Sequence, residues 1–239
     1  MIVALACVLP ACDRSPPPDA TPRVPAESIT GPGRVSGLVY FKGPVREQKV
    51  IRNEPCCPGA PPTLFDESII VNANATLRNV VVTLEGGPKT DGKNLPPAEL
   101  DQVFCQYVPH VLGVVVGQTL TIKSSDATTH NVHIKRNAGG DKNFWMDKAG
   151  QSTTTTFTAV DIAKTVCDVH PWMSAFIYVH DNTFFAVTDE SGAFTLQGIP
   201  MGKYTLVAWH EIFGRLEQSI DVTSDKPESL DFTYAPPTR

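Results

Sequence analysis

The stretch VCDVHPWM, residues 166–173, is the most informative part of this sequence, because it places Cys167, His170 and Met173 at regular short intervals. The chain holds only six His and four Met, so the grouping calls for an explanation. Either the three side chains belong by coincidence to a buried strand, or they form a loop that binds a metal. A metal loop needs another His, and THNVHIK at residues 129–135 offers His130.

The composition is that of an ordinary globular protein. The chain has 239 residues, 41% of them hydrophobic and 19% charged, which is enough for one or two domains with real cores. A formal net charge of −5, without a run of Lys or Arg, argues against a nucleic-acid partner. Nothing after residue 12 is apolar for long enough to cross a bilayer.

The first residues have a different character. MIVALACVLPAC, residues 1–12, is apolar and precedes the Pro-rich segment DRSPPPDATPRVP. It resembles the end of a bacterial lipoprotein signal, with Cys12 as the lipidated residue; a buried first strand is the alternative. We therefore expect a signal or lipobox over 1–12, a disordered tether over 13–33, and a location in the periplasm or cell envelope. Any membrane contact would come through this anchor.

An oxidising compartment changes the interpretation of the cysteines. Two of the six lie in the leader, which leaves Cys56, Cys57, Cys105 and Cys167. A disulfide between Cys105 and either Cys56 or Cys57 would account for two of them. Cys167 then stands apart beside His and Met.

From residue 34 onward the chain predicts an all-β fold. Short segments rich in Val, Thr, Ile and Phe alternate with turn residues, as in β-sandwiches. The expected strands are RVSGLVYFKG, SIIVNAN, NVVVTLEGG, VLGVVVGQTLTIKSSD, HNVHIK, STTTTFTAV, SAFIYVH, FFAVTDESGAFTL and KYTLVAWHE. The best candidates for a helical turn are PPAELDQ and NFWMDKAG.

Two separated parts of the chain share a second pattern. AVTDESGAFTLQGIPMGKYTLVAWHE, residues 186–211, and the early segments GLVYFKG, residues 37–43, and NVVVTL, residues 79–84, resemble strands of the carboxypeptidase regulatory-like, transthyretin-like (prealbumin) sandwich, which is often grouped with carbohydrate-binding-like folds. The resemblance implies a split sandwich over 34–98 and 184–235, with a second sandwich over 101–183 inserted in a loop that tolerates it. Three modules in series are the alternative.

The segments around His130 and Cys167 fit a mononuclear copper site. Such a site uses two imidazoles and one thiolate in a plane, with a weak thioether on the axis. His130, Cys167, His170 and Met173 supply that set in that order. Zinc is disfavoured because Met is a poor zinc ligand. A two-copper site would need a second Cys in the loop.

The same residues carry a resemblance to the cupredoxins. Cys-x-x-His-x-x-Met before a strand, with Pro after the His, is similar to the ligand loop of the amicyanin type among plastocyanin-like blue copper proteins, and His130-Asn131 is similar to their first-ligand segment. The resemblance implies a Greek-key sandwich and one type 1 copper ion. It makes Met173 the axial ligand and gives Asn131 a role in holding the two ligand segments together near the thiolate. The whole chain is also similar to methylamine-utilisation-like exported proteins, from which no step in amine oxidation follows.

The remaining histidines have simpler interpretations. His133 follows His130 by three residues on a strand, so its side chain should point to the opposite face, toward solvent. His110, His180 and His210 have no ligand partner at matching spacing and are expected to be hydrogen-bonded or exposed. A further metal site formed by His110 with the cysteines near residues 56 and 105 is the weaker idea.

A copper ion coordinated by two imidazoles, one thiolate and one thioether suits one-electron transfer, because these four ligands leave no open coordination position for substrate. The sequence therefore predicts an exported electron-transfer protein, not an enzyme, which meets transient redox protein partners. We expect His170 to be the electron port, with Pro171 and Trp172, and Val108 and Pro109 beside them, as an apolar docking patch. The alternatives are a periplasmic copper-handling protein, or a carbohydrate- or surface-binding module with an accessory copper site. The partners, the reduction potential and the oligomeric state stay open.

Overall fold

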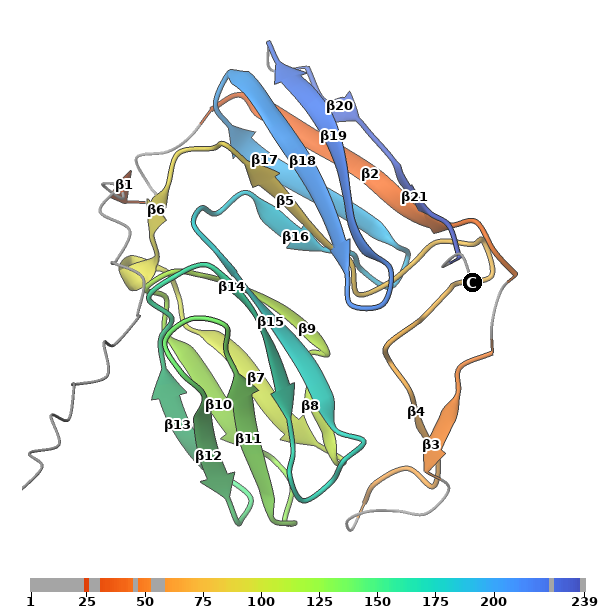
Figure 1. The fold of residues 1–239 in the computed structure, drawn as a ribbon, viewed down its shortest axis with the longest axis vertical. Helices are drawn as coiled ribbons and strands as arrows, with labels where there is room; N and C mark the ends of the chain where they lie inside the picture. The colour runs from red at the N-terminus through yellow and green to blue at the C-terminus, as the bar shows by residue number, and fades with distance from the viewer. Residues whose placement is uncertain (1–23, 26–30, 45–46, 53–58, 224–225, 237–239) are drawn as a thin grey trace, which may run out of the picture.

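The computed structural model describes residues 24–25, 31–44, 47–52, 59–223 and 226–236. Among these residues there is no α-helix, and apart from one short 3-10 helix the regular secondary structure consists of β-strands, as Figure 1 shows. The expected all-β fold of two sandwiches is confirmed. The described part of the chain contains no helix that is long and apolar enough to cross a membrane.

One sandwich, which we call the outer sandwich, is built from both ends of the described chain. Its first sheet has the order β16 (Phe185–Val187), β5 (Val81–Glu85), β18 (Gly202–His210) and β19 (Gly214–Val222). Its second sheet joins β17 (Ala193–Ile199), β2 (Gly33–Phe41) and β20 (Glu228–Ser229), and β21 (Phe232–Tyr234) also pairs with β2. The alternating apolar residues of the two sheets face each other, which is why these segments form strands at all.

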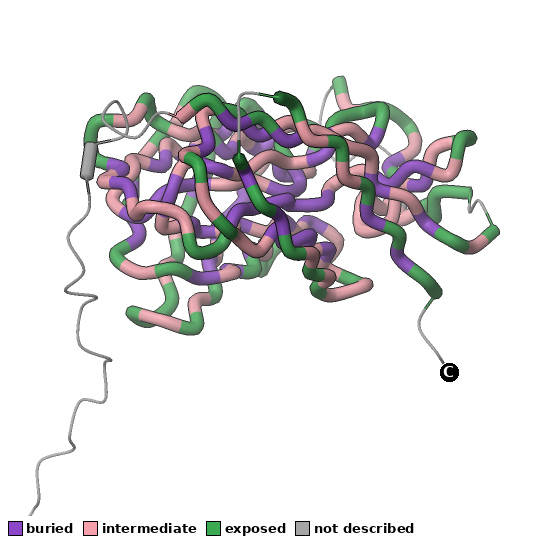
Figure 2. Tube along the Cα trace, turned by 90° about the horizontal axis from the view of Figure 1, so that it is seen from above, coloured by how far each residue is buried: buried purple, intermediate pink, exposed green. Residues whose placement is uncertain are grey.

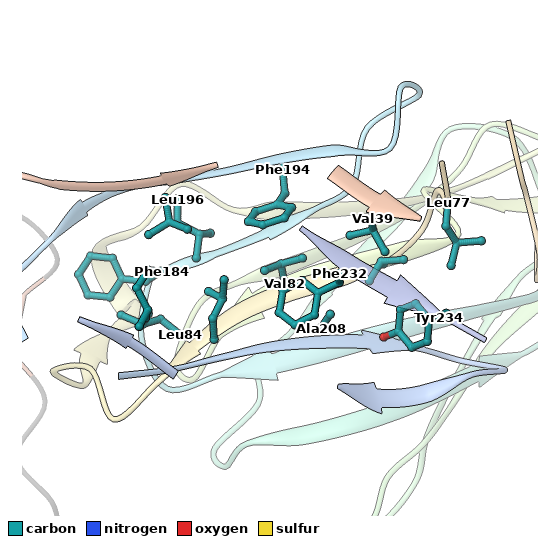
Figure 3. Close-up of a cluster of buried hydrophobic side chains, with 14 of the residues drawn as sticks. Val39, Leu77, Val82, Leu84, Phe184, Phe194, Leu196, Ala208, Phe232 and Tyr234 are labelled. Carbon is teal, nitrogen blue, oxygen red and sulfur yellow. The ribbon is translucent and has the colours of Figure 1, made fainter. Parts of the chain in front are cut away.

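The core of the outer sandwich lies between these sheets. Val39, Phe194 and Leu196 form one side and meet Val82, Leu84 and other residues of the opposite sheet, as Figure 3 shows. All of these side chains are buried. The cluster therefore combines residues 35–84 with residues 184–234 and includes none from the segment between them.

The other sandwich, which we call the inner sandwich, comes from the middle of the chain. One sheet has the order β13 (Gln151–Thr155), β10 (Leu120–Ser124), β7 (Ala98–Val103) and β8 (Gln106–Val108). The other has the order β12 (Lys142–Met146), β11 (His130–Lys135), β14 (Asp161–Val166), β15 (Ser174–His180) and β9 (Val111–Val115). Strand β10 runs parallel to β7, and β15 runs parallel to β9. The buried cluster of this sandwich spans residues 100–179.

The two clusters support an inner sandwich inserted into the outer one, which we keep as a proposal for the domain boundaries. The two sandwiches lie one above the other in Figure 1. Buried and less buried residues alternate along much of the tube in Figure 2, as expected for strands with one face on a core. The remaining short elements are β1 (Val24–Pro25), which pairs parallel with β6 (Thr90–Asp91), and the 3-10 helix η2 (Gly92–Asn94), which directly follows β6.

The long connection from β2 to β5 leaves the outer sandwich. It carries β3 (Val50–Arg52) and β4 (Leu64–Phe65), which pair antiparallel. These two strands lie to one side of the inner sandwich in Figure 1. Residues 49–51 and 65–68 reach the segment 171–174 and border a cavity with it.

Three local predictions were wrong. PPAELDQ and NFWMDKAG, expected as helical turns, contain β7 and β12, because their residues alternate between buried and exposed along paired strands. SIIVNAN, expected as a strand, contributes only a single bridge between Val71 and Leu77. There the chain turns back, with the Ala75 N–H donating to the Asn72 carbonyl at 2.9 Å, since Asn side chains favour turns.

Candidate metal centre

Two neighbouring strands of one sheet bring the ligand segments together. Strand β11 begins at His130, and β14 ends at Val166, directly before Cys167. The two strands are antiparallel, so the start of β11 lies next to the end of β14. The register pairs His133 with Val166 and thus places His130 beyond the end of the ladder, beside the 167–173 loop.

The two imidazoles face each other across the candidate centre. His130 Nδ1 lies 2.9 Å from His170 Nδ1, and the ring centroids are 4.7 Å apart. His130 is fully buried, whereas His170 is partly exposed. Two nitrogens turned toward one another in this way are suited to share one cation, with the second imidazole reaching the surface.

Cys167 supplies a thiol to the same place. Its Sγ lies 3.9 Å from His170 Nδ1 and accepts from the His170 backbone N–H at 3.3 Å. Within the part of the chain that the structure describes, it is the cysteine with a free thiol. Burial raises the pKa of Cys167, but hydrogen bonds from His130 and from backbone N–H groups outweigh this, and the pKa is lowered overall. The site thus favours the thiolate, which is the form that binds metal.

The loop between Cys167 and Met173 is closed by its own backbone. The Met173 N–H donates to the His170 carbonyl at 2.9 Å, and the Cys167 N–H donates to the Met173 carbonyl at 3.3 Å. Met173 is 1% exposed and belongs to the same buried cluster as Cys167. The structure therefore brings all four sequence-predicted ligands to one end of the inner sandwich.

Asn131 joins the two ligand segments. Its Oδ1 accepts from the Asp168 backbone N–H at 2.7 Å and from Cys167 Sγ at 3.5 Å. Its Nδ2 donates to the Asp168 carboxylate at 2.7 Å and to Asn143 at 2.8 Å. A buried amide with both ends satisfied fixes the position of the loop relative to β11.

Asp126 is a residue that the sequence interpretation missed. Its carboxylate accepts from His130 Nε2 at 2.9 Å, and also from the backbone N–H groups of Phe104 at 2.7 Å and Cys105 at 2.8 Å. Burial raises the pKa of Asp126, but these hydrogen bonds lower it overall. An Asp four residues before a His in a loop is too common a pattern to indicate this contact.

The same carboxylate acts on His130. Burial lowers the pKa of His130, but the hydrogen bonds to Asp126 and Cys167 raise it to about 9. A carboxylate on the far nitrogen orients the ring and strengthens the near nitrogen as a ligand. Asp126 thus turns Nδ1 of His130 toward the centre.

Cys105 also lies close to the imidazoles. Its sulfur and one ring nitrogen each of His130 and His170 lie within 4.8 Å of one another. Cys105 is, however, disulfide-bonded and so has no thiolate to offer. Its predicted partners, Cys56 and Cys57, lie outside the described residues, and the choice between them stays a prediction. Cys12 and the leader also lie outside these residues.

The other histidines lie away from this centre. His133 is on the opposite face of β11, where its Nδ1 lies 3.2 Å from the Asp168 carboxylate and its Nε2 lies 3.5 Å from Asp141. His110 contacts Ser174 and Glu211, and the group of metal-binding side chains found among the described residues does not include it; Cys56 and Cys57 lie outside those residues. His180 and His210 are buried, and burial lowers their pKa values to about 3 and about 4.

Most of the residues expected to form a docking patch lie at the surface. Val108 is 48% exposed, and Pro109 and Pro171 are exposed. Trp172 is half-buried, packs against His170 with ring centroids 5.0 Å apart, and donates from Nε1 to the Cys105 carbonyl at 3.2 Å. Trp172 therefore supports the imidazole as well as lining the surface.

One family model and several solved structures match parts of the chain. Residues 151–230 match the family model described as polysaccharide lyase family 4, domain II, and not the carboxypeptidase regulatory-like family expected for the outer sandwich. This match covers the end of the inner sandwich and much of the outer one. No curated protein matches the sequence.

Solved structures with similarity to part of the chain include copper proteins. A point mutant of amicyanin in the Cu(I) state is 23% identical, covering 41% of this chain and 98% of that one with a TM-score of 0.33. A second point mutant of amicyanin, in the reduced state, is 24% identical with the same coverage and TM-score. The copper-containing nitrite reductase from Thermus scotoductus SA-01 is 23% identical, covering 37% of this chain and 23% of that one with a TM-score of 0.32.

Proposed function

We propose that this chain is an exported type 1 copper protein that carries single electrons between redox partners. The observation that supports it most directly is the pair of facing imidazole nitrogens, 2.9 Å apart, with the Cys167 thiol at 3.9 Å from one of them. Two imidazoles, one thiolate and a buried thioether are the donor set of a blue copper site. The donors present therefore fit this metal better than zinc or a hard cation.

Each ligand has its own support in the fold. His130 is held by Asp126 on its far nitrogen, and Cys167 is held by the hydrogen bonds of the 167–173 loop. Asn131 ties that loop to β11. Copper would supply a one-electron couple here, and a frame that holds the ligands in place during the change of charge suits rapid electron transfer.

His170 is the proposed port for electrons. It is the partly exposed member of the pair, and Pro171 and Trp172 lie beside it. A redox partner that docks on this small, partly apolar surface comes close to the imidazole without displacing a ligand. Such encounters use small, short-lived interfaces.

Export belongs to the same proposal. Cys105 is disulfide-bonded, and disulfides persist in oxidising compartments such as the periplasm. Cell fractionation of the full chain tests it: we expect the protein in the envelope or periplasmic fraction, and recovery in the cytoplasm with reduced cysteines would contradict export.

The test of the copper assignment is a comparison of the wild type with Cys167→Ser after loading with copper. The wild type should show the intense visible band of a copper–thiolate bond and should lose and regain it on reduction and oxidation. Cys167→Ser should lose the band, because a hydroxyl cannot replace the thiolate. His133→Ala is the matched control and should keep it. A colourless wild type, or a band that survives Cys167→Ser, would contradict the proposal. A copper-handling protein would instead release its metal readily to a competing chelator.

A further inference from the structure

The outer sandwich packs directly on the strand that follows the 167–173 loop. The rings of Phe176 and Tyr178 on β15 meet Trp209 of β18, with centroids 5.4 and 5.7 Å apart. Further along β15, His180 stacks on Phe185 of β16 at 3.8 Å. Aromatic contacts of this kind fix the two sandwiches against each other.

His110 connects this interface to the candidate metal centre. Its Nδ1 lies 3.0 Å from the carbonyl oxygen of Ser174, the residue directly after Met173. Its Nε2 contacts the carboxylate of Glu211, at the turn between β18 and β19 of the outer sandwich. Since a carbonyl can only accept, Nδ1 carries the hydrogen and donates it to Ser174. The His110 carbonyl also accepts from the Phe176 N–H at 2.9 Å.

This contact is shielded from water. The side chains of His110 and Glu211 are 5% and 9% exposed. Hydrogen bonds in such surroundings are stronger than those in water, and leaving one partner without the other is costly. The pair is therefore a firm link between the outer sandwich and the start of β15.

A cavity beside Met173 makes the contacts of His110 more important for holding the chain there. A cavity of about 420 Å³ is bordered there by Met173, Ser174 and His110, together with residues 49–51 and 65–68 of the outer sandwich connection. The Met173 side chain itself is buried, but the chain beside it borders open space on this side. The contacts of His110 with Ser174 and Phe176 therefore add to the pairing of Ser174 with Val166 in restraining this end of the loop.

We propose that His110 and Glu211 are positioning residues, through which the outer sandwich sets where Met173 is presented to copper. The inference rests on the proposed copper function. An axial thioether tunes the reduction potential of a blue copper site, and a thioether held farther away donates less to Cu(II), which raises the potential. The inner sandwich alone does not contain this control, because Glu211 belongs to the outer one.

The first test measures the reduction potential of the copper-loaded full chain. His110→Leu removes both side-chain contacts of His110, to Ser174 and to Glu211. This should loosen the hold on Met173 and, because a more distant thioether raises the reduction potential, shift that potential upward. Glu211→Gln keeps the size of the side chain but removes its charge, so we expect a smaller shift in the same direction. His110→Asn places an amide N–H near the former Nδ1 and should restore much of the wild-type value. Glu217→Gln, which changes an exposed ion pair with Arg215, should leave it unchanged. Wild-type potentials in both His110→Leu and Glu211→Gln would overturn the proposal.

The second test uses the metal-free chain and so does not depend on copper. Amide hydrogen exchange over residues 167–176 should become about fivefold to tenfold faster in His110→Leu, as expected for the loss of one buried hydrogen bond. His110→Asn should stay near the wild-type rate. Unchanged exchange in His110→Leu would overturn the positioning role even if the wild type is blue. If the wild type takes up no copper, the proposed function fails, and the exchange rates still decide whether His110 holds the loop.

Discussion

Asp126 shows how one buried carboxylate prepares a ligand at the scale of single residues. It accepts from His130 Nε2 at 2.9 Å and is 4% exposed. A neutral imidazole carries one hydrogen, and this contact keeps it on the far nitrogen, which leaves the Nδ1 lone pair for a metal. The same carboxylate binds the turn that contains Cys105.

We therefore expect Asp126→Asn to lower copper affinity by about tenfold, because the amide can no longer hold the ring in one orientation as an anion does. Competition with a copper chelator measures the change. Asp141→Asn, which alters an exposed carboxylate near His133, is the matched control and should bind as the wild type does. Equal affinities for Asp126→Asn and the wild type would show that Asp126 has no part in binding.

Met173→Leu tests the axial ligand. The side chain is buried, and Leu has a similar volume, so the fold should tolerate the change. The visible band should remain, while the reduction potential should rise, since Leu donates nothing to copper. Spectroelectrochemistry measures both properties. Complete loss of copper in this variant would contradict an axial role for Met173.

At the scale of elements, much of the candidate site was predictable because its parts are local in sequence. The loop from Cys167 to Met173 carries three of the four predicted ligands at short spacing. His130 was added because a copper site of this kind needs a second imidazole and because His130-Asn131 resembles the first-ligand segment of the cupredoxins. The contact between His110 and Glu211 could not be predicted, since it joins residues 101 positions apart and depends on how two sandwiches dock.

The strands themselves were predictable to a similar degree. Apolar alternation identified β2, β5, β15 and β18. DIAKTV, which forms β14, was missed because Asp161, Lys164 and Thr165 weaken its pattern, although the structure alternates buried and less buried residues along it. PPAELDQ was misjudged because Pro and acidic residues favour a helix start, whereas pairing with β10 decides the outcome.

His180 links β15 to the outer sandwich, and its burial should make the free energy of unfolding depend on pH. Burial lowers its pKa from 6.5 to about 3, and its Nδ1 lies 3.1 Å from the Thr83 hydroxyl oxygen. Below pH 6.5 the His180 imidazole binds a proton in the unfolded chain, whereas in the folded chain it does so only below about pH 3. Its contribution to stability is thus fully present above pH 6.5 and falls as the pH decreases, by up to about 1.4 kcal/mol per pH unit.

Urea unfolding of the metal-free chain at about pH 7 and about pH 4.5, on either side of the unfolded pKa, measures this effect. We expect His180→Phe, which keeps the ring stack with Tyr178 and Phe185, to lose less stability between the two pH values than the wild type does. His210, whose pKa is lowered to about 4, contributes in the same direction and remains in both proteins. Equal losses in the two proteins would exclude His180 as a source of the dependence.

At the scale of the whole molecule, the interface between the sandwiches sets their relative position. Trp209 meets Phe176 and Tyr178, and Phe185 lies so close to β9 that a Cβ at Gly113 would come within 2.3 Å of its ring. A larger residue at position 113 would have to displace the Phe185 ring, which stacks on His180. From this close fit we expect the two sandwiches to unfold together.

Trp209→Ala should weaken the interface between the two sandwiches. We expect a loss of about 2 kcal/mol in the free energy of unfolding, because the substitution removes aromatic contacts from a half-buried site. The thermal transition should also broaden or split as the sandwiches unfold separately. Trp145→Ala, at a residue that is 59% exposed on β12, is the control and should change little. A single unshifted transition for Trp209→Ala would show that the interface contributes nothing.

The proposed copper site is best tested by a crystal structure of the copper-loaded full chain with anomalous scattering measured at the copper edge. We expect one strong peak bonded to Nδ1 of His130, Nδ1 of His170 and Sγ of Cys167, with the Met173 sulfur on the axis. A peak at another place, such as beside Cys105 without Cys167, or no peak in protein shown to be folded, would contradict it.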